Sequence, residues 1–123
     1  MEVIKAKIQT IYGQVPSKSN CYKIITLSGH GSLAKTKALK DYEKSFYLQC
    51  NLYRNANIKG LFEFNVDVYY PSNRADLDNS LKIILDSLQQ VKAIDNDNKC
   101  VMIVARKFVD KANPRIEFSL IEC

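Results

Sequence analysis

The hydrophobic period changes abruptly between residues 61 and 88. In LFEFNVDVYY, residues 61–70, apolar and polar side chains alternate, which is typical of a strand with one buried face. Pro71 ends that run, and residues 73–88 then carry an apolar stripe at spacings of three and four, which predicts an amphipathic helix. Because the strand and the helix each have one apolar side, we expect them to pack as a layer of helices on a sheet.

The flanking segments complete an α+β pattern. Residues 2–12 and 115–122 alternate as strands, and residues 32–54 predict a helix with a basic N-terminal half. Residues 100–109 are apolar on both alternations, which predicts a central, buried strand. The order β-α-β-α-β-β therefore predicts one two-layer domain over residues 1–123, with two helices on a mixed or antiparallel sheet of about four strands.

Composition restricts the kinds of site that the chain can build. No run of about 18 apolar residues and no signal-peptide pattern is present, so we expect a soluble, cytoplasmic protein that does not enter membranes. The four cysteines are scattered singly, without zinc-site spacing, and are interpreted as free thiols. His30 is the only histidine. A metal site would therefore need oxygen ligands, which favours magnesium, manganese or calcium.

The charge is unevenly placed along the chain. Residues 1–59 hold ten basic and three acidic residues, a net charge of +7, whereas residues 60–123 hold eight basic and ten acidic residues, a net charge of −2. A basic half could bind the phosphates of a polyanion while the acid-bearing half holds a metal. A basic surface that is simply solvated explains the charge equally well. The candidate contacts with the phosphates of such a polyanion are Lys18, Lys23, Lys35, Lys37, Lys40, Lys44 and Arg74.

Two acids at the start of the second helix admit two interpretations. Asp76 fits the N-cap position and Asp78 the first turn, where a negative charge is favoured by the helix dipole, and together they contribute about 1–2 kcal/mol. Lys82 and Asp86, four residues apart, fit an ordinary surface ion pair. Taken alone, these residues favour helix capping over a metal site.

Asp97 changes that balance because it precedes the strand that follows the helix. If the loop folds Asp97 back over the helix N-terminus, three carboxylates converge and require a cation. The loop itself, residues 95–106, is not a calcium-binding EF-hand, because Cys100 replaces the required glycine and Arg106 the required glutamate. The tripeptide DNK, residues 97–99, also fits the D-x-K half of a restriction-type nuclease signature, which stays a minor rival.

The segment RADLDNSLKIILDSLQQVKAIDNDNKC, residues 74–100, resembles the RusA family of Holliday junction resolvases, which occur largely in phages and prophages. Its order is similar to the family pattern: an arginine, D-x-D-N, a lysine four residues after the second aspartate, an aspartate four residues later, and an acidic pair opening the next strand. VPSKSNCYK, residues 15–23, is similar to the family's Pro-Ser-x-Asn loop. The resemblance covers nearly the whole chain.

The resemblance implies a structure-selective endodeoxyribonuclease that acts in DNA recombination and repair. It places the metal ligands on Asp76, Asp78 and Asp97 and the essential lysine on Lys82, with Mg²⁺ as the cofactor and Mn²⁺ as a substitute. Two departures stand out: Asn96 replaces one acid of the acidic pair, and the N-terminal loop has one extra residue.

The expected substrate is a four-way junction or other branched DNA. A junction has two-fold symmetry and needs two symmetric nicks, so a small domain with one site predicts a homodimer. Two alternatives stay open: a non-catalytic protein that binds branched DNA on the same scaffold, and a nuclease for other branched DNA.

Overall fold

The computed structural model describes residues 7–123, apart from the side chains of Lys18 and Leu27, so the predicted strand residues 2–6 lie outside the described part. It confirms an α+β fold with two helices and a four-stranded mixed sheet, together with a separate two-stranded sheet. The elements are β1 (Gln9–Tyr12), β2 (Tyr22–Leu27), β3 (His30–Lys35), α1 (Lys37–Gln49), β4 (Phe62–Tyr70), α2 (Leu77–Gln90), β5 (Cys100–Val109) and β6 (Arg115–Glu122).

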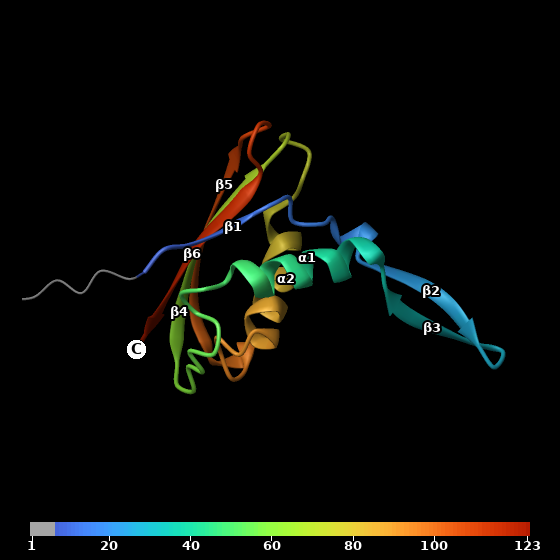
Figure 1. Ribbon diagram of the computed structural model, residues 1–123, viewed down its shortest axis with the longest axis horizontal. Helices are drawn as coiled ribbons and strands as arrows, with labels where there is room; N and C mark the ends of the chain where they lie inside the picture. Colours follow the sequence, from blue (N-terminus) through green and yellow to red (C-terminus); the bar gives the residue numbers. More distant parts are fainter. Residues whose placement is uncertain (1–6) are drawn as a thin grey trace, which may run out of the picture.

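The main sheet has the strand order β1-β6-β4-β5. β4 pairs antiparallel with β6 and parallel with β5, and α2 forms the crossover between the two parallel strands. Both helices lie on the same side of the sheet (Figure 1). Because α2 runs back across the sheet before β5 begins, the start of β5 lies near the C-terminal half of α2.

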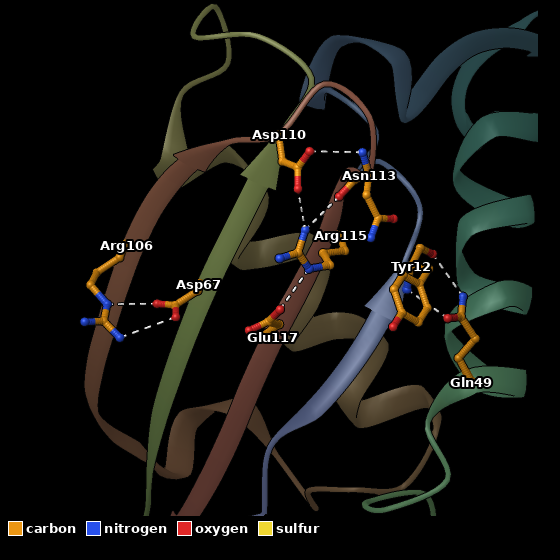
Figure 2. Close-up of polar contacts among 8 residues, drawn as sticks. All are labelled: Tyr12, Gln49, Asp67, Arg106, Asp110, Asn113, Arg115 and Glu117. Carbon is orange, nitrogen blue, oxygen red and sulfur yellow. Dashed lines mark hydrogen bonds and ion pairs between the residues drawn. The ribbon is translucent and has the colours of Figure 1, made fainter.

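The core lies between the sheet and the helices. Alternate residues of β4 from Phe62 to Tyr70 are buried, as the alternation predicts. Phe118 of β6 is central, with its ring centroid 5.9 Å from that of Phe46 on α1 and 5.6 Å from that of Tyr53. β1 is tied to α1 at the edge of this core: the Tyr12 N–H donates to Gln49 Oε1 at 2.8 Å, and Gln49 Nε2 donates to the Tyr12 carbonyl at 3.0 Å (Figure 2).

The first predicted helix is shorter than expected. It begins at Lys37 rather than near residue 32 and ends at Gln49, while β2 and β3 form an antiparallel hairpin that extends away from the rest of the molecule (Figure 1). Ser28 and Gly29 close the hairpin with positive φ angles of 50° and 80°, the left-handed conformation of a tight two-residue turn. The apolar spacing within residues 32–36 therefore belongs to a strand.

The strand predicted to be central, β5, lies at the edge of the sheet. Four consecutive apolar side chains there are half-exposed: Val101 at 55%, Met102 at 46%, Ile103 at 44% and Val104 at 42%. The prediction was wrong because apolar residues on both alternations show only that both faces of a strand are apolar. The turn after β5 carries β6 to the other side of β4, so nothing in the described chain pairs with the outer edge of β5.

Within residues 7–123, neither helix has the length and hydrophobicity needed to cross a membrane.

Candidate active site

The start of α2 presents two carboxylates that make no side-chain hydrogen bond or ion pair with the described residues. Asp76 is the N-cap residue and has the extended backbone of an N-cap, with φ −91° and ψ 129°, but its side chain makes no capping hydrogen bond. Asp78 lies in the first turn. Neither carboxylate forms an ion pair with a described residue. The predicted capping bond is therefore absent, and only the favourable helix dipole remains of the capping interpretation.

The end of β4 supports this helix start. The Tyr70 hydroxyl is within 2.5 Å of Ser80 Oγ in α2, so the first turn of the helix is joined to the strand. Burial raises the pKa of Tyr70, and the negative charges of Asp78 and Asp76 raise it further. The phenol therefore stays protonated, and the two free carboxylates lie close enough to influence it electrostatically.

Lys107 of β5 holds the loop that leads into α2. Its ammonium donates to the carbonyls of Asn73 at 3.1 Å and Ala75 at 2.5 Å, and it lies 5.8 Å from the centroid of the Tyr70 ring. Lys107 was not among the residues predicted from the sequence. Lys107 is paired with Val68 in the register of the sheet, on the face that carries the core, and a charge on an otherwise apolar face was the signal that could have identified it.

Lys82 joins two further carboxylates. Its Nζ lies 2.9 Å from Asp86 Oδ1 and 2.9 Å from Asp97 Oδ2, so both oxygens share one cation. The hydrogen bond to Asp97, followed by that to Asp86, raises the pKa of Lys82 above its ordinary value. The ammonium is therefore protonated and occupies the space between two acids where positive charge is favoured.

Asp97 is positioned by a short 3-10 turn, Asp97–Lys99, that precedes β5. Its backbone N–H donates to Gln89 Oε1 of α2 at 3.2 Å. Asn96, which stands where the family pattern has an acid, caps this turn by accepting from the Asn98 N–H at 3.0 Å. The turn therefore faces the C-terminal half of α2.

The acids consequently form two groups along α2. Asp76 and Asp78 lie at its start, whereas Asp86 and Asp97 surround Lys82 farther along. Asp97 is positioned between these regions: its Oδ2 contacts Lys82, four residues after Asp78, and its N–H donates to Gln89 near the end of α2. In residues 7–123 no three His, Cys, Asp or Glu side chains are close enough together to hold one metal ion.

The chemistry of these donors nevertheless fits a hard divalent cation. All four groups are carboxylates, the ligands that magnesium and manganese prefer. Asp76 and Asp78 have no side-chain hydrogen-bonding partner among the described residues, and Asp86 and Asp97 already share the charge of Lys82.

Glu43 of α1 is a further acid near this region and was not among the residues predicted from the sequence. Its carboxylate accepts from Lys35 Nζ at 2.9 Å and from the Gln90 side chain. The hydrogen bond to Glu43 raises the pKa of Lys35, and the charge of Asp86 adds to the effect. A hollow of about 260 Å³ lies between these groups, with lining residues Tyr22, Lys35, Leu39, Glu43, Ile83, Asp86, Gln89 and Gln90.

A second hollow connects the N-terminal loop with the start of α2. It has a volume of about 460 Å³, and its lining includes Pro16, Ser17, Arg74, Asp76 and Asn79. Two segments that are nearly sixty residues apart in the sequence thus meet beside Asp76. Both segments belong to the stretches on which the sequence resemblance rests.

The candidate DNA-binding cations differ in their surroundings. Lys35 lies on β3 rather than on the first helix and pairs with Glu43, and Lys37 pairs with Asp41 at 2.9 Å. The side chain of Lys18 lies outside the described part. Four candidates are exposed and make no ion pair with a described residue: Lys23, Lys40, Lys44 and Arg74.

Comparison with known proteins assigns the chain to a family. The family model described as Endodeoxyribonuclease RusA matches residues 14–121, which include the N-terminal loop, both helices and all four predicted catalytic residues. The comparison with curated proteins finds no match. The matched range includes both the N-terminal loop and the start of α2, the two segments that meet beside Asp76. The chain therefore belongs to the RusA endodeoxyribonuclease family.

Proposed function

We propose that the protein is a magnesium-dependent endodeoxyribonuclease that resolves four-way DNA junctions by paired symmetric nicks in recombination and repair. The observation that carries this proposal is the family match over residues 14–121, which makes the chain a nuclease by membership. The arrangement along α2 supports it. Asp76 and Asp78 have no side-chain partner among the described residues and could bind a cation, and Lys82, held by Asp86 and Asp97, could bind a phosphate oxygen.

Asp76, Asp78 and Asp97 would hold the cation, with Mn²⁺ able to replace Mg²⁺. When bound, a divalent cation supplies charge neutralisation at the phosphoryl group and a more acidic water. Because the described carboxylates do not converge on one position and Asp97 Oδ2 contacts Lys82, Asp97 has to move from this position for the three ligands to meet. The phosphate group of DNA offers Lys82 an alternative anion, so substrate binding would favour such a movement.

Lys82 acts as a cation and not as a base in this proposal. Its raised pKa keeps the ammonium protonated, so it cannot accept a proton from water at neutral pH. It can donate hydrogen bonds to a non-bridging phosphate oxygen and stabilise the charge that develops as water adds and one P–O bond of the backbone breaks. Asp86, four residues along the same helix face, keeps the ammonium near that position.

DNA contacts are proposed for the basic residues that are not neutralised within the chain. Lys23, Lys40, Lys44 and Arg74 are the strongest of these, whereas Lys35 and Lys37 already have acidic partners. Arg74 lines the hollow beside Asp76, where it can meet a phosphate close to the carboxylates. We further propose that one chain forms one nuclease domain, that the protein works in the cytoplasm, and that two copies act on one junction.

A second function, binding of branched DNA without cleavage, is favoured by one observation. The carboxylates of the described residues do not converge on a single metal position. The two proposals differ in whether the strands are cut when metal is present.

The test is cleavage of a synthetic four-way junction beside flap and linear duplex controls, with Mg²⁺ and with EDTA. We expect symmetric nicks in the junction with Mg²⁺ only. Tight junction binding without any cut in Mg²⁺ or Mn²⁺ would favour the binding protein, and preferential cutting of the flap would favour a nuclease for other branched DNA.

A further inference from the structure

Glu43 of α1 is a carboxylate that joins its helix to β3 and to α2. It accepts from Nζ of Lys35, the last residue of β3, at 2.9 Å and from the side-chain amide of Gln90, the last residue of α2. The side chain of Glu43 is 15% exposed, whereas that of Lys35 is 41% exposed. A carboxylate that is so far out of water has to be paired, and Lys35 supplies the charge that pairs it.

The pair of Lys35 and Glu43 borders the candidate active site through Asp86. All three residues line the hollow of about 260 Å³. The hydrogen bond to Glu43 is the largest cause of the raised pKa of Lys35, and the negative charge of Asp86 adds to it, so the ammonium interacts with both carboxylates. Lys35 therefore has a second acid close to its flexible side chain, although its ion pair is formed with Glu43.

Asp86 is already used on its other side. Its Oδ1 lies 2.9 Å from Nζ of Lys82, which also contacts Asp97. Charged groups of alternating sign thus follow one another from β5 to α1, in the order Asp97, Lys82, Asp86, Lys35 and Glu43. A second ammonium placed against Asp86 would compete with Lys82 for the same carboxylate.

The backbone around Lys35 is fixed, so that only its side chain can change partner. β3 ends at Lys35, Thr36 caps α1, and the Thr36 N–H donates to the carbonyl of Cys21 at 2.9 Å. The backbone of Lys35 therefore stays beside the hollow, while its four-carbon side chain can rotate. Loss of the charge on Glu43 should redirect the ammonium rather than move the strand.

We infer that Glu43 is a positioning residue for Lys82. By binding Lys35, Glu43 keeps a competing ammonium away from Asp86. Asp86 is then left to hold the Lys82 ammonium where it can donate to a phosphate oxygen of the substrate. The inference rests on the proposed function, which gives Lys82 its role, and it adds a residue of α1 that acts only through other side chains.

The first test is Glu43→Gln, in nicking of a synthetic four-way junction with Mg²⁺. The amide keeps the size of the side chain and an oxygen that can accept from Gln90, so the change removes little besides the charge. The rate at saturating junction should fall about 10-fold, because a displaced Lys82 ammonium no longer meets the phosphate. The Kd for the junction should stay equal or fall, because Lys35 is freed for DNA. A folded variant that nicks at the parent rate overturns the inference.

Asp41→Asn is the matched control. Asp41 lies on the same helix and pairs with Lys37 at 2.9 Å, so this change also replaces an acid by its amide and frees one lysine. The lining of the hollow beside Asp86 includes neither of these residues. The variant should nick at the parent rate. An equal loss of rate in both variants would show that any freed lysine of this region slows cleavage, which overturns the specific role of Glu43.

A double variant, Glu43→Gln with Lys35→Met, separates positioning from packing. Methionine keeps an unbranched apolar side chain at position 35 and removes the competing charge, so the rate should rise at least about 3-fold above that of Glu43→Gln alone. A merely structural role of Glu43 predicts the opposite, because the second change removes a further contact. Circular dichroism and urea unfolding check that each variant is folded. A folded double variant that is no faster than Glu43→Gln overturns the inference.

A measurement that needs no cleavage keeps this inference apart from the proposed function. In a crystal structure of the Glu43→Gln variant without DNA, Lys35 Nζ should lie within about 4 Å of a carboxylate oxygen of Asp86, as in an ion pair. A Lys35 side chain that stays away from Asp86 overturns the inference whether or not the protein cuts DNA. A parent protein that never nicks a junction contradicts only the proposed function.

Discussion

Both helices begin after a residue type that commonly caps helices, but only one of the two side chains forms the capping hydrogen bond. Thr36 precedes α1, and its Oγ1 accepts from the Leu39 N–H at 3.3 Å. Asp76 precedes α2 with similar extended backbone geometry but caps nothing. The start of α1 is thus stabilised by its cap, whereas the two carboxylates at the start of α2, beside Tyr70, bind none of the described side chains. A capping residue type predicts where a helix begins, and only the hydrogen bond shows whether its side chain acts as a cap.

The largest expected effect comes from Asp78→Asn. If the start of α2 is kept for a cation, loss of this carboxylate should lower the nicking rate at least about 100-fold, as removal of an electrostatic group from an active site commonly does. Stability should change by at most about 1 kcal/mol, because only the dipole interaction is weakened. Without metal, junction binding should stay equal or tighten. Nicking and gel-shift assays measure both, and cutting at the parent rate would make α2 an ordinary helix start like α1.

Lys82→Ala should also lower the nicking rate, by a factor of about 100, with junction binding equal or slightly weaker. The change leaves Asp86 and Asp97 without their shared cation, so the two acids repel each other. The control is Lys99→Ala, a lysine of the same 3-10 turn as Asp97, which should leave the rate unchanged. A loss of activity in the Lys99 variant instead would favour the restriction-type D-x-K site.

Metal should act on the α2 region more than on any part of α1. Addition of Mg²⁺ or Mn²⁺ should raise Tm. At a free metal concentration 100 times the Kd, the added free energy of unfolding is about 2.7 kcal/mol. EDTA should abolish nicking. In the Asp78→Asn variant the increase in Tm should be smaller, whereas in Lys37→Ala on α1 it should match the parent. An equal increase in both variants would place the metal elsewhere.

The smallest expected effect is the difference in unfolding free energy between variants of the two N-cap residues. Thr36→Ala should cost about 1 kcal/mol of unfolding free energy, since it removes a capping hydrogen bond. Asp76→Ala should cost less than about 0.5 kcal/mol, since only the dipole interaction is lost. Urea unfolding measures both values. Nuclease activity should rank the variants in the opposite order, and an Asp76→Ala variant as destabilised as Thr36→Ala would restore the capping interpretation.

Local periodicity was sufficient for the parts of the fold that depend on near neighbours. The alternation of residues 62–70 identified β4, and the spacing of apolar residues identified α2 with nearly correct bounds. The helical repeat placed Lys82 beside Asp86, which the structure confirms at 2.9 Å. These features need only the geometry of a strand or a helix, and that geometry is the same wherever the element lies.

Tertiary structure alone decided which elements meet. The hairpin of β2 and β3, the edge position of β5, the contact of Asp97 with Lys82 and the pairing of Glu43 with Lys35 all depend on how separate segments pack. Hydrophobic pattern measures how apolar each face of a segment is but not which neighbour covers it. For β5 the pattern indicated a strand buried on both faces, and the fold left that strand half-exposed. The strand order of the sheet and the path of the crossover, which no local pattern contains, made that difference.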